Sequence, residues 1–565
     1  MVLRFMLSGK AKTLFIQAGF FLLTLLLGGI QAWNHRYNLS TGDAVSYLDI
    51  GDAYWRGNFS AAINDYFSPL YCWILGFFIK VISPGIYWEF LTVKIANLFI
   101  LSCGFLAFSF FLKEFIYYYE AKVNQGETKK YLQIPQWIWL ILGYSLFIWS
   151  SLQWIGVDND TPDMCVATIT YLAAGLILKI YTRSDSWYNF LFLGVTLGVG
   201  YLAKAIMFPM ALIFLGTCFF CIGSLRRTWG RIILATLIFI VVAGPFIFAI
   251  SQKSGSFTFG SAGKLNYAWN ISHNIGGHHW QGKPSGSGTP QHPTRVIFAE
   301  PTVYEFATPI AGTYPPWHDP SYWNAGLQPK PNLPRQIAEV VSHSWEYYQI
   351  FGKYLLFGYL IFIIASGNFW VQGRELLKNW PLYIPACAGL GALLLVHVRP
   401  RLIASFVVLL FAAVFGSLRL PNNPQVKRFV IGITLGVCLL TLSSLSNISD
   451  IAGEPIHWKI AQGLEKLGVT NGEQIAILGK YGDGSSYYWA RLAKVKIVVE
   501  IPEIASFWDA DSTTQKQIYQ EVKDAGAKLI VQEVGTKPSE DSNWQQISNT
   551  NCYLHFLTKP QNLES

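Results

Sequence analysis

Residues 90–112, FLTVKIANLFILSCGFLAFSFFL, form an unbroken apolar stretch that is followed by a basic connection over residues 113–131. A helix rises about 1.5 Å per residue, so about 20 apolar residues cross the hydrocarbon of a membrane. The stretch is long enough to span. The connection holds Lys113, Lys122, Lys129 and Lys130, and short loops with such charge stay on the cytoplasmic side. An apolar span that ends in a basic inner loop is therefore the unit to look for along the chain.

The same unit recurs throughout the first 450 residues. We predict eleven membrane spans, near residues 13–32, 90–112, 132–151, 164–181, 188–203, 205–223, 232–251, 354–372, 382–397, 402–417 and 429–447. Sixteen of the 42 lysines and arginines fall in six connections: 1–12, 113–131, Arg183, 224–231, 373–381 and 418–428. These six alternate so that all can lie on one side. We therefore place them, with the N-terminus, in the cytoplasm.

One further apolar run, Tyr66–Ile82, does not fit this alternation as a crossing. If it crossed, the loop at 113–131 would face outward and every later loop would invert. We therefore predict a juxtamembrane or re-entrant helix there. The outer face then receives residues 33–89, the acidic turn Asp158–Asp163, Lys204, the 252–353 segment, Arg399, Arg401 and everything after 448.

Composition supports a polytopic α-helical membrane protein. The 565 residues are 52% hydrophobic and only 13% charged, which excludes a soluble multidomain enzyme. The inner loops account for the net charge of +9, so no nucleic-acid partner is expected. The eight cysteines show neither a disulfide framework nor a zinc spacing. We predict a transmembrane domain over residues 1–450, with outer loops 33–89 and 252–353.

From residue 451 the pattern changes. Short helical segments alternate with β-rich runs such as Gln474–Leu478, Lys496–Glu500 and Lys528–Gln532. This pattern predicts a small α/β extracytoplasmic domain over residues 451–565.

The first outer loop holds three acidic residues, Asp43, Asp49 and Asp52, at helical spacing. Two faces result, with Asp43, Tyr47, Ile50 and Tyr54 on one and Asp49, Asp52 and Arg56 on the other. Asp52 and Arg56 have the spacing of a solvated ion pair. Asp43 is either a helix N-cap or a functional carboxylate. Its position beside aromatic side chains, directly above a span, favours the functional interpretation.

A second acidic group separates two spans. Thr161, Pro162 and Asp163 form a good helix start, so Asp163 fits a structural role as well as a functional one. Asp158 and Asp160 are one residue apart. They would hold a divalent cation, orient a sugar hydroxyl or lie in a solvated turn, and the sequence leaves these alternatives open.

Four cations lie at the level of these acidic groups: Lys94, Lys204, Arg399 and Arg401. A lysine between apolar runs, such as Lys204, either snorkels to the interface or meets an anion. Together the four suit the phosphate of a lipid whose head group faces outward.

The 252–353 segment is too long to be a simple connection, and such loops are commonly functional. Its aromatic side chains are interleaved with polar ones around His278 and His279, and again from Tyr314 to Trp323. Aromatic faces and polar edges suit sugars. Metal binding by His278, His279 or His292 is the weaker alternative, because no helical pair or thiolate accompanies them.

In these features the chain resembles the GT-C membrane glycosyltransferases, in particular the branch of protein O-mannosyltransferases and lipid A aminoarabinose transferases. The resemblance spans about residues 10–420. It is carried by Asp43 with Tyr47, the run Tyr66–Trp73, the turn Thr161–Asp163 and Leu202–Lys204 at the end of a span. It implies that Asp43 is the essential acidic residue of the first loop, and that Lys204 lies near the lipid phosphate. Relatives often carry a glutamate before the proline of the juxtamembrane run. Here Ser68 precedes Pro69, so that role is either absent or moved to Asp65 or Asp158.

The resulting hypothesis is an inverting hexosyl- or pentosyltransferase that uses a polyprenyl-phosphate sugar and a lipid, glycan or protein acceptor. Asp43 is the expected catalytic base, and the expected substrate-binding residues are Tyr47, Tyr66, Asp158, Asp160, Asp163, Lys94, Lys204, His278, His279, Arg399 and Arg401. The sequence indicates no cofactor with certainty. A divalent cation at Asp158 and Asp160 stays open. The expected location is a bacterial inner membrane, with the endoplasmic reticulum as an alternative. A transporter or flippase of lipid-linked sugars and a polysaccharide ligase are the competing functions.

Overall fold

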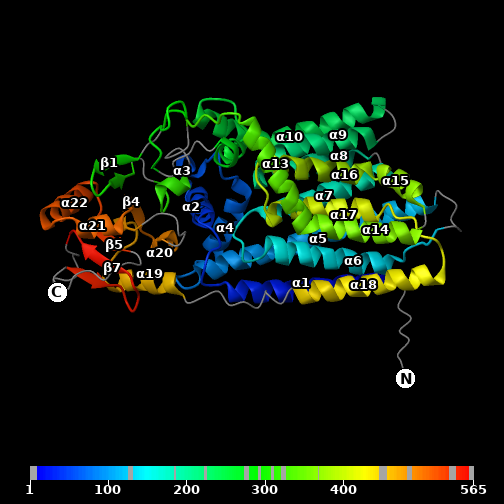
Figure 1. The fold of residues 1–565 in the computed structure, drawn as a ribbon, viewed down its shortest axis with the longest axis horizontal. Helices are drawn as coiled ribbons and strands as arrows, with labels where there is room; N and C mark the ends of the chain where they lie inside the picture. The colour runs from blue at the N-terminus through cyan, green and yellow to red at the C-terminus, as the bar shows by residue number, and fades with distance from the viewer. Residues whose placement is uncertain are drawn as a thin grey trace, which may run out of the picture.

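The computed structural model describes the chain in twelve ranges: 9–124, 131–183, 186–221, 225–272, 279–290, 294–306, 311–319, 326–366, 368–444, 455–479, 486–532 and 543–558. Most of these residues are helical, and the helices form one long bundle with a mixed α/β domain at one end (Figure 1). We call this the domain end of the bundle.

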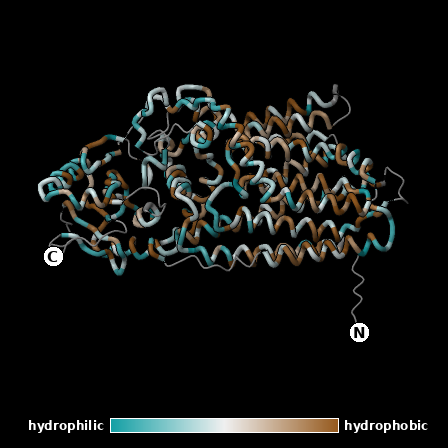
Figure 2. Tube along the Cα trace, viewed as in Figure 1, coloured by the Kyte–Doolittle hydropathy of each residue, from teal (hydrophilic) through white to brown (hydrophobic). Residues whose placement is uncertain are grey.

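The bundle consists of apolar helices. Within the described ranges, seven helical segments are long and apolar enough to cross a membrane: Ala11–Asn34 in α1, Glu89–Val123 in α5, Gln136–Ile155 in α6 and its π-helical extension, Asp163–Thr182 (α7), Thr228–Ser254 in α10, Leu333–Ser366 (α13 and α14) and Pro424–Ser444 (α18). Shorter apolar helices are α8 (Trp187–Ala203), α9 (Met207–Cys221), α16 (Trp380–Leu394) and α17 (Pro400–Phe415). Hydrophobic residues dominate the bundle, whereas hydrophilic ones gather at the domain end (Figure 2). The prediction of a polytopic helical membrane protein with a C-terminal α/β region is confirmed.

Three helices that follow the first span lie at the domain end: α2 (Asp43–Trp55), α3 (Phe59–Ala62) and α4 (Pro69–Ile82) (Figure 1). Pro69 begins α4 at a position where a missing N–H does no harm. Helix α4 packs closely on α2. Gly51 permits this approach, because any Cβ at this position would lie 2.6 Å from the Cys72 carbonyl oxygen. The apolar run Tyr66–Ile82 therefore forms a helix that serves as the support of α2.

The α/β domain contains one seven-stranded sheet with the order β1-β2-β4-β3-β5-β7-β6. Its strands are β1 (Arg295–Phe298), β2 (Val303–Glu305), β3 (Gln474–Leu478), β4 (Lys496–Ile501), β5 (Leu529–Gln532), β6 (Trp544–Gln546) and β7 (Tyr553–Phe556). The central strands β4, β3 and β5 are parallel and, apart from their residues Gln474 and Lys496, buried, whereas the outer strands are antiparallel. The helices of this domain are α19 (Ile456–Lys466), α20 (Ser486–Leu492), α21 (Ile504–Asp509) and α22 (Ser512–Asp524).

The sheet is not built from the C-terminal segment alone. Strands β1 and β2 belong to the 252–353 segment, and β2 pairs with β4 through Tyr304 opposite Glu500. The same segment also forms α11 (Ala262–Tyr267) and α12 (Pro315–His318) before it enters α13 (Leu333–Tyr347). The boundary predicted at residue 451 therefore separates strands that share one sheet.

Candidate active site at the domain end

Asp43 is the first residue of α2, and Gly42 occupies the N-cap position. The N-cap interpretation of Asp43 is therefore wrong. The carboxyl group lies at the domain end near Lys204 and Arg401, and the Trp317 indole lies beside it. Burial raises the pKa of Asp43 above its ordinary range, although Arg401, Lys204 and Trp317 act to lower it. The site thus favours a carboxyl group that can take up a proton.

The two cations near Asp43 are held by a second carboxylate, Asp163. Lys204 Nζ donates to Asp163 Oδ1 at 2.6 Å, and Arg401 Nε lies 3.6 Å from Oδ2. Asp163 stands in the first turn of α7 and also accepts a hydrogen bond from Thr161 Oγ1 at 2.9 Å. It therefore stands at the start of a helix and fixes two cations at once, while its role in substrate binding stays a prediction.

These cations come from places where the chain breaks between helices. Lys204 caps the C-terminus of α8, and Arg401 follows Pro400 in the first turn of α17. Arg401 Nη1 is buried and, within the part of the chain that the structure describes, has no hydrogen-bond partner. A buried guanidinium donor without a partner is unfavourable unless a ligand supplies an acceptor.

Arg399 takes a different position, because its side chain is exposed and its Nε donates to His397 Nε2 at 3.1 Å. Burial and the positive charges of Arg399, His343, Arg401 and Lys204 lower the pKa of His397 to about 4. His397 is therefore neutral near pH 7 and can accept this bond. Sequence reasoning missed His397, although it lies only two residues before Arg399 in the turn that leads into α17.

Aromatic side chains enclose the carboxylate from the α2–α4 side. Tyr47 packs edge-on against Phe67 and Tyr71, with ring centroids 5.0 and 5.1 Å apart, and Tyr66 lies 5.9 Å from Trp269. Tyr47 is buried, whereas Tyr66 keeps part of its surface exposed. Trp317, in α12, completes this group and was not among the predicted site residues.

Lys94 and Asp160 form a separate, closed pair. Lys94 Nζ lies 2.7 Å from both carboxylate oxygens of Asp160 and 2.8 Å from the Asp158 carbonyl oxygen. Asp160 also accepts hydrogen bonds from Ser40 N and Asn97 Nδ2. Both side chains are fully buried. The expected role of Lys94 and Asp160 in substrate binding is therefore wrong, because the two buried side chains form an ion pair with each other.

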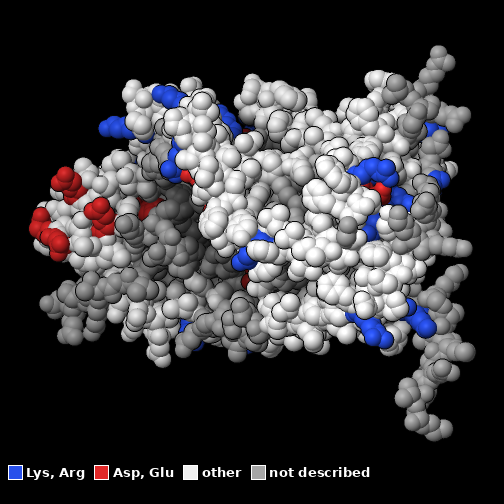
Figure 3. Space-filling model, turned by 45° about the vertical axis from the view of Figure 1, so that its right-hand side comes forward, with Lys and Arg blue, Asp and Glu red and all other residues white. Residues whose placement is uncertain are grey.

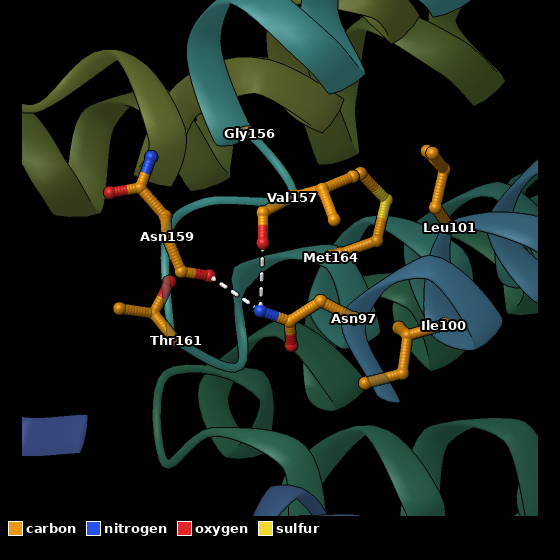
Figure 4. A pocket seen from close by; sticks show the side chains of 8 residues that line it. All are labelled: Asn97, Ile100, Leu101, Gly156, Val157, Asn159, Thr161 and Met164. Carbon is orange, nitrogen blue, oxygen red and sulfur yellow. Dashed lines mark hydrogen bonds between the residues drawn. The ribbon is translucent and has the colours of Figure 1, made fainter. Parts of the chain in front are cut away.

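Lys94 pairs with Asp160, and chelation of a divalent cation by Asp158 and Asp160 stays a prediction. Among the residues described, no group of three His, Cys, Asp or Glu side chains could hold a metal ion. Asn97 beside the pair donates to the Val157 and Asn159 carbonyl oxygens at 3.0 and 3.2 Å, next to a small cavity (Figure 4). The loop over residues 156–162 is thus a structural element, and Asp163 follows it at the start of α7.

Replacing Lys94 with methionine is expected to lower the free energy of unfolding by about 3–5 kcal/mol, because the buried Asp160 carboxylate would lose its partner. Thermal unfolding in detergent would measure the loss. Lys528→Met is the control, because Lys528 is 56% exposed in its side chain and lies 3.4 Å from Glu473. An exposed pair of this kind contributes less than about 1 kcal/mol. Equal destabilisation by the two substitutions would contradict the assigned role of Lys94.

His279 does not join the Asp43 group. Its ring stacks on Tyr304 with centroids 3.6 Å apart, and its nitrogens lie 3.2 Å from Thr294 Oγ1 and Glu500 Oε2. It therefore belongs to the contact between the 252–353 segment and the sheet, and its role in substrate binding stays a prediction. His278 and His292 lie outside the described residues.

No family model matches this chain, and no curated protein matches it. In structure it is similar to the Archaeoglobus fulgidus oligosaccharyltransferase in complex with Zn and sulfate, with 13% identity and a TM-score of 0.48 over 91% of this chain and 68% of that chain. It is also similar to ArnT from Cupriavidus metallidurans bound to undecaprenyl phosphate, with 11% identity and a TM-score of 0.42 over 96% of this chain and 98% of that chain. A third similar structure is the Archaeoglobus oligosaccharyltransferase AglB in complex with an inhibitory peptide and a dolichol-phosphate, at 13% identity and a TM-score of 0.45 over 92% and 69% of the two chains. Its structural neighbours are thus an oligosaccharyltransferase and ArnT.

Proposed function

We propose that this protein is a glycosyltransferase of the GT-C type, which transfers a sugar from a polyprenyl-phosphate donor to an acceptor hydroxyl on the non-cytoplasmic face of a membrane. One observation carries the proposal. A proton-accepting carboxyl group, Asp43, lies beside two cations, Lys204 and Arg401, that a second carboxylate holds at the end of an apolar bundle. This is an arrangement for removing a proton from one reactant while stabilising negative charge on another.

In the proposed reaction the acceptor oxygen attacks the anomeric carbon of the donor sugar. The bond between that carbon and the phosphate oxygen breaks, and its electron pair stays on the phosphate. The acceptor proton passes to the Asp43 carboxylate. A single displacement of this kind inverts the anomeric configuration.

The leaving phosphate gains charge as the bond breaks, so it needs fixed cations. Lys204 and Arg401 fit this role because Asp163 orients both, and because Arg401 Nη1 is a buried donor without a partner in the described residues. Arg399 adds an exposed positive charge two residues away. Tyr66 and Trp317 offer flat apolar faces to a sugar ring, and an apolar bundle suits the polyprenyl chain.

The reaction class can be tested with the purified protein in lipid vesicles and a panel of polyprenyl-phosphate sugars labelled in the sugar. We expect release of free polyprenyl phosphate together with a glycosylated product of inverted configuration. A flippase would instead move the intact donor across the vesicle membrane without cleaving it. Movement without cleavage would contradict the proposal.

The acid side of the pH profile offers a further prediction. A base must be ionised, so the rate at saturating donor should fall as pH decreases through the raised pKa of Asp43. Burial sets that pKa, and Arg401 and Lys204 both lower it. Lys204→Met removes one of these cations and should move the acid limb to higher pH. Lys253→Met removes a lysine that pairs with Asp319 and does not act on the pKa of Asp43. It should leave the limb in place. A limb that does not move in Lys204→Met would contradict Asp43 as the base.

A further inference from the structure

We infer that the α/β domain holds the carboxylate helix α2 and the loop above it in their working positions, and that Arg491 is the positioning residue that makes this connection. The inference rests on the proposed function, since it assigns a role in transfer to a residue outside the site. It gives the C-terminal domain a task that neither its sequence nor its sheet topology suggests.

Arg491 lies in α20, which stands beside α2 at the domain end (Figure 1). Its guanidinium reaches three carboxylates from two other helices. Nη1 donates to Asp49 Oδ1 at 2.6 Å, Nη2 lies 2.7 Å from Asp52 Oδ2, and Nε donates to Glu89 Oε1 at 2.6 Å. Arg491 is 3% exposed and Glu89 1%, so the centre of the cluster is buried, whereas Asp52 lies at its partly exposed edge. Lys494 also pairs with Glu89, which gives three carboxylates and two cations.

This arrangement ties α2 to both α5 and the α/β domain. A planar guanidinium with several donors fixes direction as well as distance, whereas a lysine provides only a point charge. The solvated ion pair predicted from the sequence is present, with Arg56 Nη2 3.7 Å from Asp52 Oδ2. The same oxygen lies closer to Arg491 Nη2, at 2.7 Å. Asp49 and Asp52 of α2 thus both form ion pairs with Arg491.

Polar groups recur along α2 at intervals of three residues, at Asp43, Ser46, Asp49 and Asp52, so their positions wind around the helix. The segment 313–317 lies along α2 and contacts several of them. Thr313 N and Oγ1 donate to the Asp49 carboxylate at 2.7 and 3.1 Å, and Ser46 Oγ donates to the Trp317 carbonyl oxygen at 2.9 Å. The Trp317 indole then reaches Asp43 itself. The segment therefore bridges from the Arg491 cluster to the proposed base.

The same segment is fastened to the sheet. Ile497 N in β4 donates to the Thr313 carbonyl oxygen at 2.9 Å, and Tyr314 OH donates to the buried Glu500 Oε2 at 2.8 Å. Strand β4 and Arg491 belong to the same α/β domain. This domain thus holds both α2 and the segment 313–317 that lies along it. A shift of that body would move Asp43 and Trp317 together.

Arg491→Ala in the full-length protein tests this inference through local hydrogen exchange and kinetics. We expect amides of residues 43–55 and 311–319 to exchange faster than in the wild type, because both segments lose their common anchor. For the folded protein, kcat should fall by about 10- to 100-fold while the KM for the polyprenyl-phosphate donor changes little, since a displacement of about 1 Å suffices for such a loss. Arg491→Lys should recover only part of the rate.

Arg295→Ala is the matched control, because Arg295 pairs with Glu305 in the same sheet but is 65% exposed in its side chain. It should leave exchange and kcat unchanged. Asp52→Asn provides a milder test if Arg491→Ala does not fold, because it weakens one of the three contacts without removing the cation. It should change exchange in the same two segments by a smaller amount.

Wild-type exchange in both segments in Asp52→Asn and in any folded Arg491 variant would overturn the inference, as would an unchanged kcat. The exchange measurement does not depend on the reaction. If no donor is cleaved by the wild type, the proposed function fails, whereas faster exchange in the Arg491 variants would still show that the domain holds α2.

Discussion

Asp43→Asn is expected to lower the rate of sugar transfer by about 10²- to 10⁴-fold, the range that a positioned general base contributes. Asparagine has nearly the same shape but cannot take up the acceptor proton. The amide keeps an oxygen that can accept a hydrogen bond beside Trp317, so the fold and donor binding should be retained. The measurement is kcat at saturating donor and acceptor, with binding of polyprenyl phosphate measured in parallel.

Asp524→Asn is the control for this substitution, since Asp524 is an exposed residue at the end of α22 and far from the bundle in sequence. It should transfer sugar at the wild-type rate. If Asp43→Asn turned over near the wild-type rate, with expression and donor binding unchanged, the assignment of Asp43 as base would fail.

Arg401→Gln is expected to raise the Kd for polyprenyl phosphate by about 10- to 100-fold, because a hydrogen bond to a charged group contributes about 1.5–3 kcal/mol. Lys204→Gln should weaken binding as well. The double variant should lose less than the sum of the two, because both side chains share Asp163 and are therefore coupled. Binding of a fluorescent polyprenyl phosphate to protein in nanodiscs would measure these constants.

Lys253→Gln serves as the control, because this lysine lies at the end of α10 and pairs with Asp319 rather than with Asp163. It should bind polyprenyl phosphate as the wild type does. Full affinity in the Arg401 and Lys204 double variant would show that the phosphate binds elsewhere, even if transfer itself were impaired.

Much of the fold follows from charge and hydropathy along the chain. Each apolar run predicted as a span overlaps a helix of the bundle, because spans must be apolar whatever their neighbours are. Acidic side chains gather on the α/β domain, and several basic ones lie at the far end of the bundle (Figure 3). Asp163, Lys204 and Arg401 could be grouped in advance, because each follows or precedes a break between apolar runs.

The remainder depends on contacts between distant segments. Arg491 meets Asp49 across 442 positions of sequence, and no local pattern relates the two. Strands β1 and β2 have only four and three residues, too few for a recognisable alternation. Lys94 was expected to face a ligand because it is a cation near the end of a span. Its partner Asp160 lies in a loop whose course only the folded chain defines.

Trp317 and His397 show a different limit. Trp317 was noticed among many aromatic residues of the 252–353 segment, and nothing in the sequence distinguishes it from its neighbours. It reaches Asp43 because Thr313 and Tyr314 anchor the preceding turn to α2 and β4. His397 stands beside Arg399, but its neutral state depends on four cationic or titratable side chains from different elements. Positions of this kind are set by tertiary structure.

The most direct test of the proposed site is a cryo-EM structure of the protein with polyprenyl phosphate bound in a nanodisc. We predict density for the phosphate within about 3–4 Å of Arg401 and Lys204, on the side that faces Asp43. Phosphate density at the opposite end of the bundle, near Arg374 or Arg419, would contradict the assignment of the donor site and with it the proposed function.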